Sequence, residues 1–120
     1  MMQTEVDLGN YTWVMNEKEV VKRLEKFVDE RDWAQFHTVE NLAKSISIES
    51  AELLELFQWS SEASKKLILD ELADVLTYCF MLANKLGVSP AELILKKLST
   101  SVKKYPVSKA KGKSTKYDRL

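Results

Sequence analysis

Two pairs of carboxylates recur along the chain with the same spacing. Glu49 and Glu52 form the first pair, Glu71 and Asp74 form the second, and Glu55 extends the first pair by another step of three. A helix turns about 100° per residue, so side chains three positions apart lie only about 60° apart on one face. The spacing therefore predicts two negatively charged clusters, each on a single helix face.

The surroundings of these carboxylates favour a bound cation over an ordinary solvated surface. Four positions after each glutamate of the first cluster the chain has an apolar residue, so no lysine or arginine relieves the repulsion there. Glu71 and Asp74 interrupt an otherwise apolar helix, where an unpaired carboxylate is costly. An isolated pair is usually plain surface, but two pairs on consecutive helices can face each other. We therefore expect a hard divalent metal ion between them.

The side chains available point to Mg²⁺, with Mn²⁺ as the second choice. The chain has one His and one Cys, too few for a zinc site or for the Glu-x-x-His pairs of di-iron bundles. Mg²⁺ binds carboxylates and water and often shares its site with substrate phosphates. No glycine-rich phosphate loop is present, so basic side chains would have to help hold such phosphates.

Aromatic residues flank the second of the helices expected here. Trp33 and His37 precede it, and Trp59 is placed at its end. The tryptophans either anchor the core or form a flat slot for a nucleobase, since every base has a π-face. His37 is either a neighbour of the helix start or a polar contact to a base. Tyr78, seven residues after Glu71, either packs in the core or points its hydroxyl at the metal site.

The charge is unevenly distributed, although the net charge is zero. Residues 1–88 carry nine basic and sixteen acidic side chains, whereas residues 89–120 carry nine basic and two acidic ones. Near this basic end, Lys104 and Lys116 each directly precede a tyrosine, the first of them Tyr105. An acidic body with a basic end favours cations bound by the body and anionic groups, or an acidic partner, bound at the tail.

The composition indicates a single all-α domain. With 120 residues the chain can bury a core without disulfides, and only three Gly and two Pro leave little material for turns. Apolar stretches are interrupted well before the ~18 residues of a membrane span, and the N-terminus lacks a signal-peptide pattern. The lone Cys79 fits a core thiol in a reducing compartment, so we expect a cytoplasmic protein.

Hydrophobic periodicity and capping residues predict four helices. They are placed at residues 17–31, 39–59 and 64–85, with a fourth from Pro90 that ends before Tyr105. Thr38 and Ser89 are the expected N-caps, and Gly87 ends the third helix. The chain then divides into a loose arm (1–15), a helical domain (16–106) and a basic tail (107–120).

Several motifs together resemble the all-α, MazG-like nucleoside triphosphate pyrophosphohydrolases. That family carries Glu-x-x-Glu, a spacer of variable length and Glu-x-x-Asp; here the spacer covers residues 53–70. The resemblance extends over residues 16–120 and is closer to the dCTP pyrophosphatase branch. The matching segments of that branch are RDWAQFH at 31–37, ELLELFQW at 52–59, ELADVLTY at 71–78, YP at 105–106 and KY at 116–117.

The resemblance implies a site, an assembly and a fold. The metal ligands would be Glu49, Glu52, Glu71 and Asp74. The base would be flanked by Trp33 and Trp59, in a pocket lined by His37 and Tyr78. The family forms dimers or tetramers with pockets shared between subunits. We therefore expect a four-helix bundle that is completed by oligomerisation. We expect a nucleotide as its ligand, and neither a nucleic-acid polymer nor a membrane as a partner.

The implied reaction is Mg²⁺-dependent hydrolysis of a (deoxy)nucleoside triphosphate to the monophosphate and pyrophosphate. The expected substrate is dCTP or a modified pyrimidine relative, which would make the protein a sanitiser of the nucleotide pool. Glu52 would receive the proton of the attacking water, with Glu55 as the reserve candidate. The outer phosphates would be held by Lys104, Tyr105 and Lys116.

Two other functions remain open from the sequence. The glutamates of a non-catalytic helical module could form an acidic patch for a basic partner, which would not need Mg²⁺. A related pyrophosphohydrolase could act on dUTP or a phosphoribosyl nucleotide, because a pair of tryptophans does not identify the base. The chain also departs from the dCTP branch: it has Ser101 and Val102 where that branch tends to have Asn and Arg, and Leu24 where a His can stand.

Overall fold

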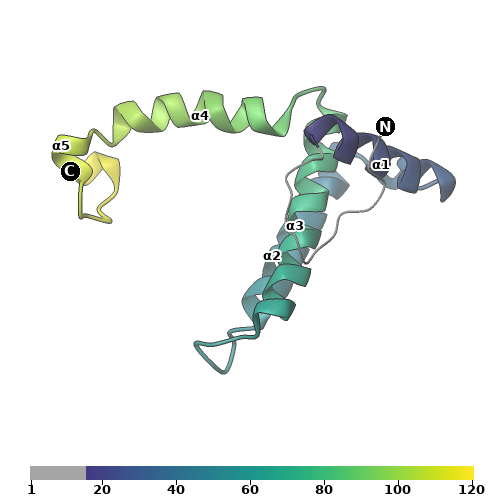
Figure 1. The fold of residues 1–120 in the computed structure, drawn as a ribbon, viewed down its shortest axis with the longest axis horizontal. Helices are drawn as coiled ribbons and strands as arrows, with labels where there is room; N and C mark the ends of the chain where they lie inside the picture. The colour runs from purple at the N-terminus through teal and green to yellow at the C-terminus, as the bar shows by residue number, and fades with distance from the viewer. Residues whose placement is uncertain (1–15) are drawn as a thin grey trace.

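Helices make up the regular structure of the protein. A computed structural model describes residues 16–120 and contains no strand in that range; the loose arm expected for residues 1–15 lies outside it. The helices are α1 (Glu17–Glu30), α2 (Val39–Glu55), α3 (Lys65–Lys85), α4 (Pro90–Lys104) and α5 (Val107–Ala110), with 3₁₀ turns at Ala34–Phe36 and Tyr117–Arg119 (Figure 1). The predicted all-α class is confirmed.

Each of the four long helices begins at a polar side chain that accepts a hydrogen bond from its first turn. The side chains of Asn16, Thr38, Ser64 and Ser89 accept from the backbone N–H three residues later, at 3.0–3.2 Å. These bonds satisfy N–H groups that have no partner within the helix. The predicted N-caps Thr38 and Ser89 are therefore confirmed, with Pro90 at the first position of α4.

The end of α3 is determined by a glycine. Gly87 has a φ of +73°, a left-handed conformation that residues with a Cβ adopt only at a cost. Its N–H donates to the carbonyl of Asn84 at 3.0 Å, and the N–H of Val88 donates to the carbonyl of Ala83 at 3.0 Å. These two bonds close the helix in a Schellman motif. The predicted end of the third helix at Gly87 is confirmed.

The second helix is shorter than predicted, because α2 ends at Glu55 and not at Trp59. The N–H groups of Leu56, Phe57 and Gln58 bond to carbonyls three residues earlier, at 3.0–3.3 Å. The last turn is therefore tightened to a 3₁₀ pitch. The hydroxyl of Ser60 then accepts from the N–H of Glu62, a local bond that competes with helix continuation. Trp59 consequently lies in the loop between α2 and α3, 89% exposed.

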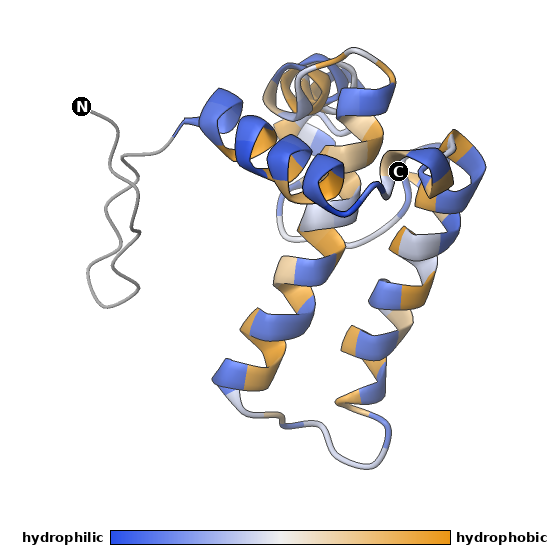
Figure 2. Ribbon diagram, turned by 90° about the vertical axis from the view of Figure 1, so that its right-hand side faces the viewer, coloured by the Kyte–Doolittle hydropathy of each residue, from blue (hydrophilic) through white to orange (hydrophobic). Residues whose placement is uncertain are grey.

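The packed part of the molecule consists of α1, α2 and α3. Helices α2 and α3 run side by side in opposite directions, joined by one loop, and α1 crosses the other end of this pair (Figures 1 and 2). Val28, Leu42 and Ala83, one residue from each helix, are the buried apolar residues of the described chain. The α2–α3 pair is thus the scaffold on which both carboxylate pairs are placed.

Helix α4 leaves this packed part and extends away from it (Figure 1). The carboxylate of Glu17, at the start of α1, accepts from the Ser89 hydroxyl at 3.0 Å and from the Ala91 N–H at 3.1 Å. It holds the start of α4 against α1. The radius of gyration is 17.6 Å, against about 14 Å for a compact domain of this length, so a single chain is open.

The C-terminal residues fold back on the end of α4. The rings of Tyr105 and Tyr117 meet edge to face with centroids 6.0 Å apart, and Lys104 Nζ lies 4.6 Å from the Tyr117 ring centroid. The N–H of Tyr117 also donates to the Tyr105 hydroxyl at 3.3 Å. We call residues 105–120 the basic hook. Within residues 16–120, no helix is long and apolar enough to cross a membrane.

Candidate metal centre

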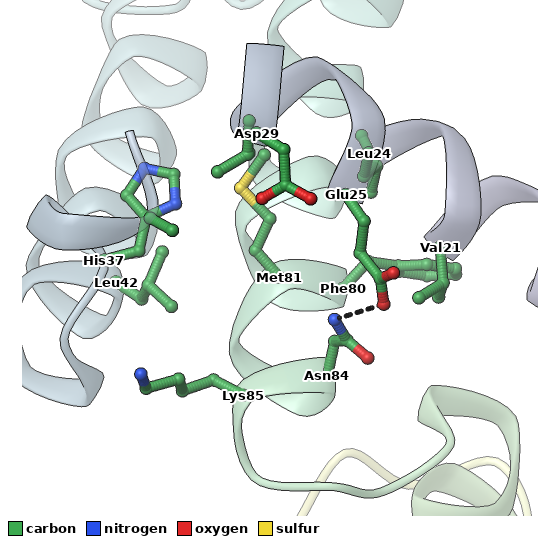
Figure 3. Close-up of a pocket in the computed structure, with 12 residues that line it drawn as sticks. Val21, Leu24, Glu25, Asp29, His37, Leu42, Phe80, Met81, Asn84 and Lys85 are labelled. Carbon is green, nitrogen blue, oxygen red and sulfur yellow. Dashed lines mark hydrogen bonds between the residues drawn. The ribbon is translucent and has the colours of Figure 1, made fainter. Parts of the chain in front are cut away.

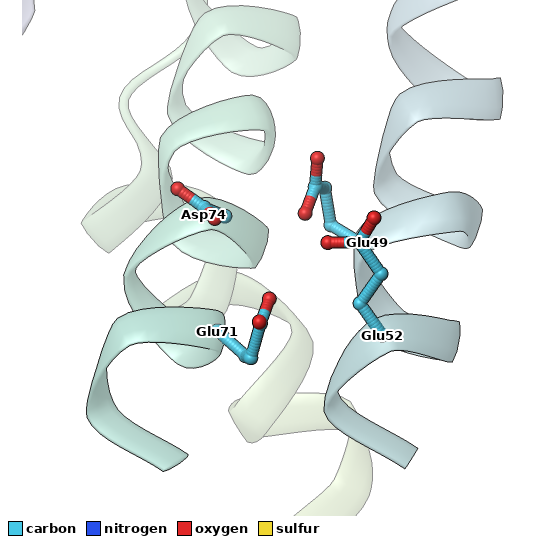
Figure 4. Close-up of side chains that lie close together, drawn as sticks. All are labelled: Glu49, Glu52, Glu71 and Asp74. Carbon is cyan, nitrogen blue, oxygen red and sulfur yellow. The ribbon is translucent and has the colours of Figure 1, made fainter. Parts of the chain in front are cut away.

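The structure brings all four predicted carboxylates together. Glu49 and Glu52 project from α2 toward Glu71 and Asp74 on α3 (Figure 4). One carboxylate oxygen from each residue lies within 4.8 Å of the other three. The spacing of three positions puts each pair on one face of its helix, and the antiparallel packing of α2 on α3 turns the two faces toward each other. We call these four residues the carboxylate cluster.

Two oxygens of the carboxylate cluster are buried without a partner. Glu49 Oε2 and Glu71 Oε2 are inaccessible to solvent and accept no hydrogen bond, whereas Glu52 and Asp74 are exposed. None of the ion pairs formed among residues 16–120 includes a member of the cluster. Buried polar atoms are nearly always paired, and leaving one unpaired costs free energy. Among residues 16–120, no ion pair therefore compensates the negative charge of the carboxylate cluster.

Burial and mutual repulsion raise the pKa of two of these carboxyls. Burial is the largest cause of the raised pKa of Glu49, followed by the neighbouring Glu52, Asp74 and Glu71. The pKa of Glu71 is raised by burial first and then by Glu52. Both effects favour the neutral form, and a bound cation would reverse them. A bound metal ion would therefore offset the burial and the mutual repulsion of these carboxylates.

The donor set fits a hard divalent cation. Carboxylate oxygens are the ligands of Mg²⁺ and Mn²⁺, and neither His37 nor Cys79 belongs to the cluster. His37 lies between α1 and α2, and Cys79 is a free thiol farther along α3. The two exposed members of the cluster leave room for water or for phosphate oxygens beside the ion, which is the usual coordination of Mg²⁺.

Glu55 does not belong to the carboxylate cluster, and the two tryptophans predicted to flank the base lie far apart. Glu55 is the last residue of α2 and is exposed. Tyr78 is half-buried on α3. Trp33 packs edge to face on Phe27 with ring centroids 5.5 Å apart. Trp33 and Trp59 lie beyond opposite ends of α2, whose 17 residues span about 25 Å. One base therefore cannot be flanked by Trp33 and Trp59 of the same chain.

The residues predicted to grip the phosphates lie in or beside the basic hook. Lys104, Tyr105 and Lys116 are at the far end of α4, away from α2 and α3 (Figure 1). In a single chain they do not approach the carboxylate cluster. These lysines stand next to tyrosines in the sequence, and Tyr105 packs on Tyr117 in the fold. Their position relative to the metal centre depends on the course of α4, which the sequence pattern does not determine.

The polar residues of a second concave site were not predicted from the sequence. Glu25, Asp29, Asn84 and Lys85 line a cavity between α1, the start of α2 and α3, together with the predicted His37. A signal was present for two of them. Glu25 and Asp29 are one turn apart and border the apolar stripe of α1 that contains Val28, which is the position of side chains at the edge of a packed interface.

Comparisons with known proteins agree on one family. The model of the MazG-like family matches residues 44–120. dCTP pyrophosphatase 1 of Rattus norvegicus is 36% identical over 113 residues, covering 85% of this chain and 66% of the rat protein. The Homo sapiens protein of the same name is 34% identical with the same coverage. The chain thus spans about two thirds of the length of these relatives.

A solved structure gives the same relationship in three dimensions. A pyrophosphatase from Archaeoglobus fulgidus, 36% identical in sequence, superposes with a TM-score of 0.72. The match covers 81% of this chain and 98% of that one. The similarity therefore extends over most of this chain and nearly all of the other one.

Proposed function

Because the chain belongs to the MazG-like family, we propose that it hydrolyses (deoxy)nucleoside triphosphates to the monophosphate and pyrophosphate. The observation that carries this proposal is the carboxylate cluster with its two buried, unpartnered oxygens. The relatives named dCTP pyrophosphatase 1 favour dCTP or a modified pyrimidine deoxynucleotide as substrate. The reaction would remove abnormal nucleotides from the pool. We place it in the cytoplasm, where a free thiol such as Cys79 stays reduced.

We propose Mg²⁺ as the cofactor, with Mn²⁺ as a substitute, held by Glu49, Glu52, Glu71 and Asp74. The absence of His and Cys from the cluster supports this choice over zinc. When bound, such an ion supplies positive charge that polarises phosphoryl oxygens and acidifies a coordinated water. The half-buried Glu49 and Glu71 would anchor it, and the exposed Glu52 and Asp74 would face the substrate.

The protein side chains would position the substrate and accept one proton. Glu52 is the preferred acceptor for the proton of the attacking water because it is exposed at the open side of the cluster; Glu55, three residues on, is the reserve. The base would contact His37 and Tyr78 and stack on tryptophan. Lys104, Tyr105 and Lys116 would hold the outer phosphates through charge-assisted and hydroxyl hydrogen bonds.

We infer that the active form is a homodimer or homotetramer. One face of α4 exposes Ile94, Leu95, Leu98 and Val102, and the hook exposes Val107; a single chain leaves these apolar side chains uncovered. Large exposed apolar patches mark protein interfaces. A second copy would cover this face, and it could also bring Trp59 and the basic hook to the metal centre of its neighbour. That arrangement would reconcile the separation of Trp33 and Trp59 with a shared base slot.

The acidic-patch module is the weaker candidate. A surface that binds a basic partner needs accessible carboxylates, whereas Glu49 and Glu71 each bury an oxygen against the α2–α3 interface. Hydrolysis of dUTP or of a phosphoribosyl nucleotide uses the same metal centre and differs only in what occupies the rest of the site.

The decisive experiment incubates the purified protein with a panel of nucleotides, with Mg²⁺, with Mn²⁺ or with EDTA. The panel contains dCTP, methylated dCTP, dUTP, dTTP, dATP and a phosphoribosyl nucleotide, with the products separated by ion-exchange chromatography. Monophosphate and pyrophosphate should appear only with the metal. Release of inorganic phosphate, or no turnover of any nucleotide, would rule the proposal out.

A further inference from the structure

A cavity distinct from the carboxylate cluster lies between α1, the start of α2 and the C-terminal half of α3 (Figure 3). Its volume is about 250 Å³, just below the roughly 300–1,000 Å³ of sites that hold whole small molecules. This volume suits one ring of a larger ligand. The apolar part of its wall includes Val21, Leu24, Val28, Leu42, Phe80 and Met81.

The cavity and the carboxylate cluster lie on nearly the same face of α3, with the cavity farther along the helix. Met81 follows Asp74 by seven residues and Lys85 follows Glu71 by fourteen, and steps of seven return to nearly the same helix face. At 1.5 Å per residue, Met81 is about 10 Å farther along the helix axis than Asp74. A nucleotide with its phosphates at the cluster would therefore extend its base along this face toward the cavity.

Hydrogen-bond acceptors dominate the polar part of the wall on the α1 side. Figure 3 shows the Asp29 carboxylate between His37 and Glu25. Asn84 Nδ2 donates to Glu25 Oε1 at 3.0 Å, which orients this glutamate. The Asp29 carboxylate forms no hydrogen bond or ion pair with any residue from 16 to 120. On the other side, His37 and Lys85 supply N–H donors.

We propose that Asp29, with Glu25 beside it, selects pyrimidine nucleotides that carry an exocyclic amino group. This inference rests on the proposed function and identifies what reads the edge of the base. A carboxylate accepts hydrogen bonds and does not donate them. The N4 amino group of cytosine is a donor, whereas the O4 of uracil or thymine is an acceptor. Cytosine therefore gains a charge-assisted bond at Asp29, where uracil would set oxygen against oxygen.

The donors on the opposite wall of the cavity can bind the acceptor atoms of cytosine. Cytosine carries acceptors at its ring nitrogen and its O2, and the Lys85 ammonium and the His37 ring can donate to such atoms. Stacking on tryptophan tolerates every base, so the edge contacts have to supply discrimination. Losing a hydrogen bond to a charged group costs a factor on the order of 10 to 100 in binding, which sets the size of the expected effect.

The test measures kcat/KM for dCTP, dUTP and dTTP with Mg²⁺, using the wild-type chain and three variants. Asp29→Asn and Glu25→Gln keep the side-chain size but add N–H donors that can meet a carbonyl. Glu30→Gln, on α1 next to Asp29 but outside the cavity lining, is the matched control. We expect the wild type to prefer dCTP. Asp29→Asn should reduce the dCTP/dUTP ratio on the order of 10- to 100-fold, Glu25→Gln should reduce it less, and Glu30→Gln should leave it unchanged.

The ratio separates selection from general damage, because misfolding lowers turnover of both substrates alike. If the wild type hydrolyses nucleotides but prefers dUTP to dCTP, the inference is overturned, whereas the proposed pyrophosphohydrolase function still stands. An unchanged ratio in both Asp29→Asn and Glu25→Gln does the same. Absence of any triphosphate hydrolysis by the wild type instead refutes the proposed function, and the inference with it.

Discussion

At the scale of single residues, the main feature is a pair of glutamates that each keep one oxygen away from water without a hydrogen bond. Glu49 and Glu71 face one another across α2 and α3, with Glu52 and Asp74 beside them. Burial of like charges is unfavourable unless a cation compensates it. The ligand set should therefore act as a unit in metal binding and in catalysis.

Removing one charge from this set should abolish turnover while the fold persists. Glu49→Gln and Asp74→Asn preserve side-chain volume but remove an anionic ligand. Loss of even an outer-shell partner costs about 10- to 100-fold, so we expect kcat/KM to fall by at least that factor. Steady-state kinetics with Mg²⁺ and circular dichroism check this. Glu40→Gln, on the exposed first turn of α2, is the control; near-normal hydrolysis by Asp74→Asn would contradict the metal assignment.

The raised pKa values predict how the metal-free protein responds to pH. Burial raises the pKa of Glu49 and of Glu71 above the ordinary 4.5. A carboxyl with a raised pKa in the folded state contributes stability that is complete below pH 4.5 and is lost as the pH rises through the folded-state pKa. The metal-free protein should therefore lose this contribution on the way from acid to neutral pH.

The comparison of the wild type with Glu71→Gln isolates this contribution. In EDTA, the variant should melt at the higher temperature, and its advantage should grow with pH until both carboxyls of the wild type are ionised. Saturating Mg²⁺ should raise the melting temperature of the wild type, because a ligand that binds only the folded state stabilises it. Differential scanning fluorimetry over a pH series measures both effects. A pH-independent difference in EDTA would mean that repulsion at the cluster is already relieved by other groups.

At the scale of helices, the shortened α2 places Trp59 in a loop. A tryptophan that is 89% exposed contributes little to the core of its own chain, so we expect Trp59 to contact a ligand or a neighbouring copy. Trp33, by contrast, is partly engaged with Phe27. The two tryptophans should therefore respond differently to substitution.

Trp59→Ala should weaken nucleotide binding without affecting Mg²⁺ affinity. Loss of one stacking face costs about 1–3 kcal/mol per base, which corresponds to tenfold or more in Kd. Titration calorimetry with a non-hydrolysable dCTP analogue and, separately, with Mg²⁺ measures the two affinities. Gln58→Ala, in the same turn, controls for local disruption. Normal nucleotide binding combined with a lower melting temperature would indicate that Trp59 has a packing role instead.

At the scale of the whole molecule, the open shape of a single chain favours the proposed assembly of two or more copies. The apolar face of α4 should be covered by a second copy, and Leu98→Asp in its middle should disrupt that contact. Size-exclusion chromatography with light scattering should give a dimer or tetramer for the wild type and smaller species for the variant. Lys96→Asp, a neighbouring substitution on the same helix, is the control. A monomeric and fully active wild type would contradict the shared-site arrangement.

The basic hook should act on phosphates and not on the base. Deleting residues 107–120 removes five positive charges, at Lys109, Lys111, Lys113, Lys116 and Arg119. We expect the truncated protein to fold, to bind Mg²⁺ and to keep its preference among bases. Affinity for triphosphates should fall further than affinity for the matching monophosphate, and this gap should shrink as salt screens the charges. Equal losses for both nucleotides would indicate a role in assembly.

Much of the fold was predictable because helix boundaries are set locally. The caps at Thr38, Ser64 and Ser89 and the stop at Gly87 act on backbone groups within one turn. The end of α2 was misplaced because the apolar pattern continues to Trp59, while the backbone tightens after Glu55 and the serines that follow offer competing bonds. Periodicity alone does not report such competition.

By itself, the sequence determined which carboxylates share a helix face, because a spacing of three positions is a property of the helix and needs no other part of the chain. Only the tertiary structure decided that the two pairs meet, since this depends on the register of α2 against α3. It also decided that Asp29 and Asn84, far apart in the chain, border one cavity, and that α4 points away from the packed helices, its start tied to Glu17. These outcomes depend on contacts between residues distant in sequence, which no local pattern encodes.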